Sequence, residues 1–132
     1  MGIGHNKELL KSLQRAASDF EIGLFEGVIA RDPDHLEALM SLGNNYTARG
    51  LVSKGLAVDV RLTSLRPKDP LVHYNLACSY SLLHRADEAM EALERAFALG
   101  YRDFEFLMKD QDLDPIRGDA RFNRLVERFA KV

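Results

Sequence analysis

The sequence predicts an all-α fold made of antiparallel helix pairs, and three features of its 132 residues lead to this prediction. Apolar residues recur at helical spacing along most of the chain. Glycines and prolines divide these stretches into segments of helical length. The chain also repeats itself at an offset of 34 residues, a length that accommodates one helix–turn–helix unit.

The 34-residue offset is carried by identical residues at equivalent positions. These matches fall at helical spacing and lie between turn-forming residues, so we interpret residues 36–69 and 70–103 as two structural repeats. The identical pairs include Leu42/Leu76, Tyr46/Tyr80, Leu65/Leu99 and Asp69/Asp103.

Residues 7–33 precede the first repeat and carry apolar residues at helical spacing. They predict either a degenerate helical hairpin or one long helix. Gly23 and Gly27 lie within this segment, and glycine weakens any helix that contains it. The sequence leaves both alternatives open.

The first repeat is predicted to contain two helices. An apolar stripe begins at Leu36 and ends before Gly50, and a second helix extends from Ser53, its expected N-cap, to about Leu65. Residues 58–63 alternate between apolar and polar side chains, which is a strand pattern. The 34-residue register nevertheless favours a helix, because it aligns them with a clearly helical segment of the second repeat.

The second repeat begins with Asp69 as the predicted N-cap and Pro70 in the first helical position. A turn at residues 83–85 leads to its second helix, which ends at Gly100.

Residues 104–132 are predicted to form a C-terminal capping segment, with a short helix near 104–109, a turn at Pro115–Gly118 and a final helix at 120–131. The final helix has one apolar and one basic face, as a terminal unit of a helical stack requires. The inward residues are Phe122, Leu125, Val126 and Phe129, and the outward residues are Arg121, Arg124, Arg128 and Lys131.

Composition excludes several classes of function. The 20 acidic and 18 basic residues give a net charge of −2, which argues against nucleic-acid binding. No segment approaches the roughly 18 apolar residues of a membrane-spanning helix. Cys78 is the single cysteine, so no internal disulfide forms, and we expect a cytoplasmic protein.

The sequence offers little for catalysis or metal binding. Asp110, Asp112 and Asp114 copy the first ligand positions of a calcium loop, but Pro115 and Arg121 replace the glycine and the acid that such a loop needs. The histidines show no i, i+4 pair, and no phosphate-binding or nucleophile motif is present. We therefore expect no enzymatic activity, no cofactor and no metal.

The two repeats resemble the tetratricopeptide repeat (TPR) family over residues 36–103. The resemblance implies a right-handed superhelix of antiparallel helix pairs, a TPR-like α-solenoid with about two to three helical hairpins and a capping helix, in one domain spanning 1–132. Asp59 departs from the family, where an aromatic or large apolar residue is usual, and Tyr101 replaces the closing proline. The residues that carry the resemblance are Leu42-Gly43-x-x-Tyr46 … Gly55 … Leu62 … Pro67 and Leu76-Ala77-x-x-Tyr80 … Ala89 … Ala96.

The resemblance also implies a concave groove, lined by the first helix of each repeat, that takes an extended peptide or a partner helix. Asn44 and Asn75 match asparagines that grip a peptide in some members, although Asn75 could instead tie adjacent helices together. Lys109 falls near a basic clamp position, but Met40 stands where a lysine is usual, which favours a less charged ligand. The implied groove residues are Met40, Asn44, Thr47, Leu71, Tyr74, Asn75, Cys78 and Lys109.

The sequence therefore predicts a non-catalytic protein–protein interaction module that binds a peptide or a segment of a partner protein. The alternative is a self-assembling, homo-oligomeric scaffold, because two repeats are fewer than the roughly three that usually bury a continuous core.

Overall fold

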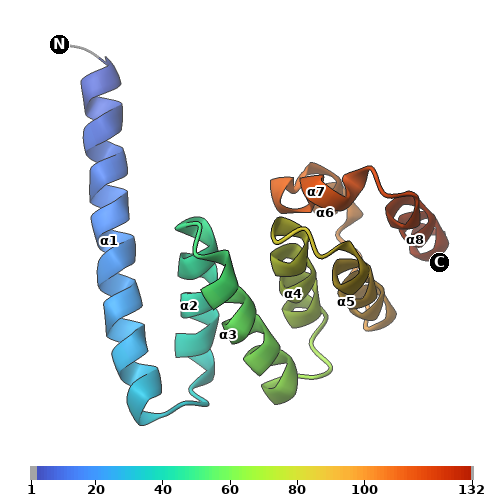
Figure 1. The fold of residues 1–132 in the computed structure, drawn as a ribbon, viewed down its shortest axis with the longest axis horizontal. Helices are drawn as coiled ribbons and strands as arrows, with labels where there is room; N and C mark the ends of the chain where they lie inside the picture. The colour runs from blue at the N-terminus through green and yellow to red at the C-terminus, as the bar shows by residue number, and fades with distance from the viewer. Residues whose placement is uncertain (1–2, 132) are drawn as a thin grey trace.

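The computed structural model describes residues 3–131 and confirms the all-α prediction (Figure 1). Residues 3–131 contain no strand, so the alternating residues 58–63 lie in a helix. Residues 1, 2 and 132 of the expected domain lie outside the described range. The elements are α1 (Ile3–Arg31), α2 (Leu36–Ala48), α3 (Val52–Leu65), α4 (Pro70–Leu82), α5 (Ala86–Ala98), α6 (Phe104–Lys109), the 3₁₀ turn η1 (Gln111–Leu113), α7 (Asp114–Arg117) and α8 (Ala120–Ala130).

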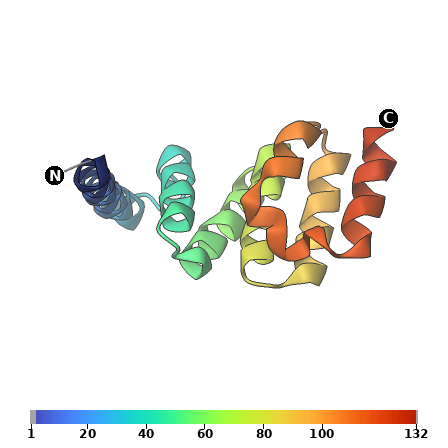
Figure 2. The same ribbon diagram turned by 90° about the horizontal axis from the view of Figure 1, so that it is seen from above.

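Helices α1 to α5 follow one another in chain order across the molecule, α6, η1 and α7 lie back against α4, and α8 lies beyond α5 (Figures 1 and 2). Helices α2 and α3 form one antiparallel hairpin, and α4 and α5 form the next. The two hairpins meet where α3 packs on α4, while α1 packs on α2 and α8 packs on α5. The two predicted repeats therefore correspond to the two central hairpins.

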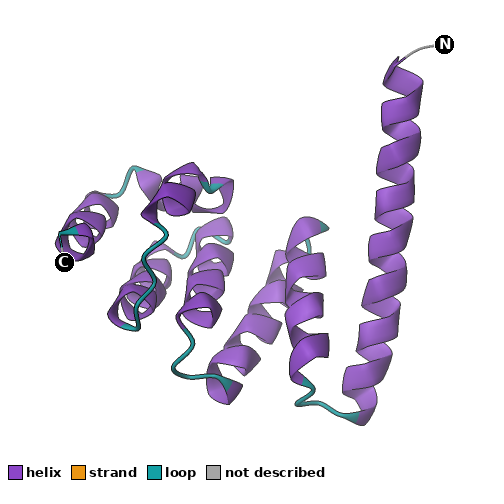
Figure 3. Ribbon diagram, turned by 180° about the vertical axis from the view of Figure 1, so that it is seen from behind, coloured by secondary structure: helices purple, strands orange, loops and turns teal. Residues whose placement is uncertain are grey.

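Residues 7–33 contribute to a single long helix, so the hairpin alternative is wrong. Helix α1 has 29 residues and extends well beyond the end of α2 (Figure 3). Gly23 and Gly27 lie inside it without interrupting it, because an isolated glycine lowers helix stability by only about 1 kcal/mol.

Gly50 follows the end of α2 and Gly100 follows the end of α5, and both lie in tight turns. Gly50 and Gly100 have φ angles of 76° and 111°, a region in which glycine has no steric cost. After Gly50, the Leu51 amide donates to the Tyr46 carbonyl at 2.8 Å, which satisfies an otherwise unpaired helix-end carbonyl.

The start of α4 is as predicted, whereas the start of α3 is not. The Asp69 carboxylate accepts a hydrogen bond from the Leu71 amide at 3.0 Å, and Pro70 opens the helix. Ser53 was the wrong N-cap for α3. The cap residue is Leu51, which has no side-chain capping bond, because the turn after Gly50 brings the chain directly into the helix.

The C-terminal segment forms the predicted short helix α6 and final helix α8. The predicted turn at Pro115–Gly118 is wrong, because residues Asp114–Arg117 form the helical turn α7. Proline at the start of a helix is preorganised for it, and the resulting turn buries Ile116.

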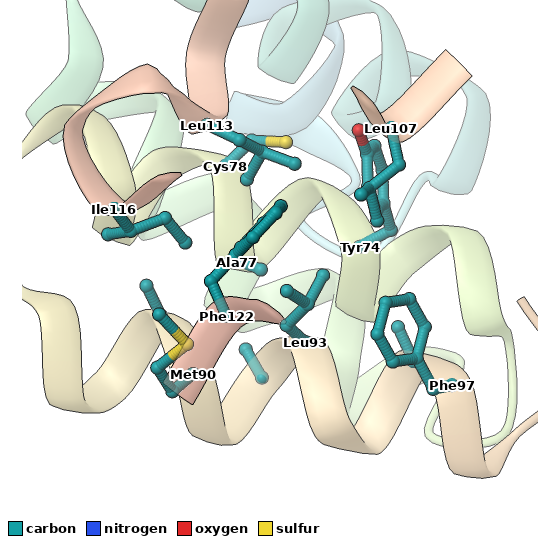
Figure 4. Packing of buried hydrophobic residues seen from close by; sticks show 13 residues of the cluster. Tyr74, Ala77, Cys78, Met90, Leu93, Phe97, Leu107, Leu113, Ile116 and Phe122 are labelled. Carbon is teal, nitrogen blue, oxygen red and sulfur yellow. The ribbon is translucent and has the colours of Figure 1, made fainter. Parts of the chain in front are cut away.

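Two apolar clusters form the core. The larger cluster lies between α4, α5 and the C-terminal segment and includes Leu93, Phe97 and Phe122 (Figure 4). The smaller cluster lies between α1, α2, α3 and the start of α4 and includes Leu42, Tyr46 and Leu62. The predicted inward face of the final helix is confirmed: Phe122 is fully buried and Leu125, Val126 and Phe129 pack against the larger cluster.

Candidate functional site

A groove of about 720 Å³ lies across α2, α4 and the beginning of the C-terminal segment. Helices α2 and α4 each present one face to it, so residues that are far apart in the sequence share one surface. Seven of the eight sequence-predicted groove residues line it: Met40, Asn44, Thr47, Leu71, Tyr74, Asn75 and Cys78.

Lys109, the eighth predicted residue, does not line the groove. Its Nζ lies 3.6 Å from an oxygen of Glu105, one turn earlier on α6, and both side chains are exposed. The expected position assumed that the 34-residue register continues into the C-terminal segment. The register is lost there, because α6 has six residues instead of the thirteen of α2 or α4.

The two groove asparagines differ from the neighbouring Asn45. The Asn45 side chain accepts from Ser18 Oγ at 2.9 Å and donates to a Glu21 oxygen at 3.0 Å, which ties α2 to α1. Among residues 3–131, no hydrogen bond joins the side chain of Asn44 or Asn75 to another residue, and both amides line the groove. Their donors and acceptors are free for a ligand.

Aromatic side chains form one end of the groove. The rings of Tyr74 and Tyr101 stack with their centroids 4.3 Å apart and their planes within 4°. Phe106 lies 6.3 Å from Tyr74 at a tilt of 58°. Tyr101 reaches this position because the chain turns at Gly100, and Phe106 follows from the first turn of α6. The result is a compact aromatic surface beside the polar lining.

Asp110 connects this aromatic end to the C-terminal segment. One of its oxygens accepts from the Tyr74 hydroxyl at 2.5 Å and lies 3.7 Å from Cys78 Sγ. The other accepts from the Asp112 amide at 3.0 Å. Burial, reinforced by nearby negative charge, raises the pKa values of Tyr74 and Cys78 well above their usual range. Both groups are therefore protonated at neutral pH.

The side chains of Cys78, Asp110 and Asp112 lie close enough to resemble a metal site, with ligand atoms within 4.8 Å of one another. Both Asp110 oxygens already accept hydrogen bonds from the protein. The Cys78 thiol is also protonated, whereas a metal binds the thiolate. This geometry suits a hydrogen-bonded link between α4 and the C-terminal segment better than a metal centre.

All charged side chains that line the groove are carboxylates. Asp59 is the most buried, and it accepts from the Ser79 hydroxyl at 2.5 Å. Burial raises the pKa of Asp59 to about 6, although the Ser79 hydrogen bond opposes the shift. Burial and the charges of its neighbours also raise the pKa of Asp112. The acidic lining residues are Asp59, Asp69, Asp103, Asp110 and Asp112.

The sequence predicted Tyr74 as a groove residue but not these acids or Tyr101, although some of them left a signal. Asp59 and Tyr101 were the positions at which the chain departs from the TPR pattern, and both line the groove. Asp110 and Asp112 were considered only as part of a calcium loop. Their place at the groove depends on the path of α6 and η1, which the repeat register does not describe.

No family model matches the chain. A segment of 56 residues, 42% of the chain, is 39% identical to part of a chloroplastic protein of Arabidopsis thaliana. The match covers 17% of that protein, so the matched segment is a small part of this relative. Within residues 3–131, no helix combines the length and the apolar character needed to cross a membrane.

Proposed function

We propose that this chain is a non-catalytic binding module that holds an extended, basic segment of a partner protein in its groove. The observation that carries the proposal is the composition of the groove, which combines stacked aromatic rings, two free amides and five carboxylates without a basic side chain. A lysine or arginine side chain matches this combination, because carboxylates attract its charge and aromatic faces bind cations.

The proposal revises the ligand expected from the sequence. Met40, in place of a lysine, had suggested a ligand of low charge. Met40 and Leu71 line the groove as apolar contacts with exposed fractions of 40% and 49%. The acidic lining adds a requirement for positive charge. Amides such as those of Asn44 and Asn75 both donate and accept, and they are suited to an extended peptide backbone.

The fold assignment belongs to the same proposal. We propose that the two hairpins are TPR-like units of a right-handed superhelix, supported by the 34-residue repeat and by the packing of successive hairpins. A cytoplasmic location is also proposed, and it rests on the single cysteine.

Synthetic peptides of matched length provide the test. A peptide that alternates lysine with serine and one that alternates glutamate with serine are titrated against the chain, with fluorescence anisotropy as the readout. We expect the lysine peptide to bind, and its affinity to fall with added salt because the charges are screened. Tighter binding of the glutamate peptide, or binding of neither peptide, would contradict the proposal.

Two variants locate the binding site. Asp69→Asn/Asp103→Asn/Asp112→Asn removes three groove charges and preserves the helix caps, since asparagine caps as well as aspartate. We expect the lysine peptide to bind at least about tenfold more weakly. The second variant, Asn44→Ala with Asn75→Ala, removes both free amides. It should abolish binding of the lysine peptide and leave the helical circular-dichroism signal intact.

The control variant removes the same number of charges at exposed positions outside the groove, with the substitutions Glu8→Gln, Glu91→Gln and Glu127→Gln. It should bind the lysine peptide as the unmodified chain does. Equal losses in the groove variant and the control would show that net charge, and not the groove, determines binding.

A further inference from the structure

Helix α1 has two apolar faces, of which only one is used within the chain. Ile22, Phe25 and Ile29 pack against the smaller core cluster. A second stripe contains Leu9, Leu13, Phe20 and Leu24, with exposed fractions of 55%, 59%, 72% and 52%, and Leu10, 56% exposed, lies beside it, about 70° from its centre. At about 100° per residue, this outer stripe spans about 60° of arc and is centred about 160° from the packed face. It points away from the rest of the molecule.

The outer stripe has a symmetric spacing. Leu9 and Leu24 are equally far from the midpoint between Ala16 and Ala17, and so are Leu13 and Phe20. A twofold axis at this midpoint would place Leu9 of one helix opposite Leu24 of a second, and Leu13 opposite Phe20. An isologous contact has this property, because each surface meets a copy of itself. The alanines at the axis permit close approach.

The charges of α1 favour the same arrangement. Residues 3–17 hold three basic side chains and one acidic side chain, a net charge of +2, and residues 18–31 hold three acidic and one basic, a net charge of −2. An antiparallel pair aligns the basic half of each helix with the acidic half of the other. At about 100° per residue, nearly all of these charged side chains lie about 90° or more from the centre of the outer stripe, so the attraction acts at long range and not through ion pairs in the contact. A parallel pair places like charges together.

From this face we infer that α1 forms an antiparallel pair with α1 of a second copy of this chain, and that the two helices meet through the outer stripe. The contact lies at the end of the molecule remote from α8 (Figure 1), and it leaves the groove residues free in both copies. This inference goes beyond peptide binding in the groove and does not depend on it.

A membrane surface is the competing occupant of an exposed amphipathic helix. Helices that lie on membranes are rich in lysine and arginine on the polar face. The second half of α1 carries Asp19, Glu21 and Glu26 instead, which anionic lipids repel. The charge pattern therefore favours a second copy of the chain over a lipid surface.

Sedimentation equilibrium over a concentration series tests the pairing. We expect the apparent mass to rise from 14.9 kDa toward twice that value. Leu13→Glu with Phe20→Glu places charges in the middle of the stripe and should raise the dissociation constant at least about tenfold. Gln14→Glu with Ala30→Glu adds the same charges to α1 outside the stripe and should leave the dimer intact.

Disulfide cross-linking tests the antiparallel direction in a Cys78→Ser background. A mixture of the Leu9→Cys and Leu24→Cys chains should form a cross-linked heterodimer faster than either chain couples to itself, and Ala16→Cys should couple to itself. Faster coupling of Leu9→Cys to itself would overturn the antiparallel arrangement.

Three further results would overturn the pairing itself. They are a monomer at every concentration, a dimer unaffected by the stripe substitutions, and a monomer that binds anionic phospholipid vesicles through the stripe. Each leaves the peptide experiment unchanged, so the two proposals fail separately.

Discussion

The helices at the two ends of the chain, α1 and α8, expose opposite kinds of side chain. Helix α8 turns its apolar face inward and covers the larger core cluster, while its outer face carries arginines that pair with α5. Helix α1 also covers a core cluster, but its outer face is apolar and exposed. Helix α8 therefore exposes a charged face, whereas α1 exposes an apolar face that suits another helix.

This difference shows that the position of a helix at the end of a stack does not determine its role. An end helix that protects the core needs a polar outer face. A large exposed apolar face is instead typical of a surface that binds another molecule. Four predictions test this contrast and the junction between the two halves, from the largest expected effect to the smallest.

The largest effect is expected from matched phenylalanine truncations at the two ends. Phe122 of α8 is fully buried, whereas Phe20 of α1 is 72% exposed. Phe122→Ala should lower the free energy of unfolding by about 3–5 kcal/mol, because it leaves a cavity in the core. Phe20→Ala should change it by less than about 0.5 kcal/mol in dilute solution. Urea unfolding measures both values, and similar losses would remove the contrast.

The second prediction concerns Asp59, which joins the two halves through Ser79 of α4. Its folded-state pKa is about 6, above the ordinary value of 3.8, so the folded state holds this proton more tightly than the unfolded state does. Its contribution to stability is therefore greatest below about pH 4 and falls as the pH rises through 6, by roughly 3 kcal/mol in all.

Asp59→Asn keeps a hydrogen-bonding group beside Ser79 and removes the charge. The variant should be more stable than the unmodified chain at pH 7, by about 2 kcal/mol, and the difference should disappear near pH 4. Urea unfolding at the two pH values measures this effect. If Asp59→Asn lowered the free energy of unfolding by the same amount at both pH values, the assigned pKa of Asp59 would be contradicted.

The third prediction compares two glycines. Gly23 lies in the middle of α1 with nothing within 4 Å of an added Cβ, whereas Gly100 follows α5 with φ at 111°. Gly23→Ala should stabilise the chain by about 0.5–1 kcal/mol. Gly100→Ala should destabilise it by at least about 1 kcal/mol, because alanine is strained at that φ. Thermal unfolding distinguishes the opposite signs, and a common sign would contradict the assigned backbone conformations.

The smallest effect is expected from the outer face of α8. Arg128 lies 3.0 Å from Glu94 of α5, and both side chains are about half exposed or more. Glu94→Gln should cost less than about 1 kcal/mol, and the cost should disappear in concentrated salt. A larger loss that persists in salt would show that this face contributes more than a solvated surface.

The sequence predicted the central hairpins well because repetition and helix termination are local signals. The 34-residue offset located both hairpins, and Asp69 with Pro70 marked the start of α4. Ser53 failed as a cap because the turn after Gly50 decides where α3 begins. The form of residues 7–33 was left open, because apolar spacing is the same in one helix as in two.

The groove was predictable where it depends on the repeats and unpredictable where it depends on the C-terminal segment. Met40, Asn44, Tyr74 and Asn75 lie on helices whose register the repeat fixes. Lys109 was misplaced because α6 is too short to continue that register. Asp110 and Asp112 were missed for the same reason, since they approach the groove only through the folded path of α6 and η1.

The stacked tyrosines provide this protein with an internal optical reporter. The sequence contains no tryptophan, so tyrosine dominates its ultraviolet emission. Two of the four tyrosines, Tyr74 and Tyr101, form the aromatic end of the groove. The Tyr74 hydroxyl donates a hydrogen bond to the Asp110 carboxylate. A neighbouring carboxylate quenches excited phenols. Any occupant that disturbs this bond should change the emission, so groove occupancy is measurable without a label.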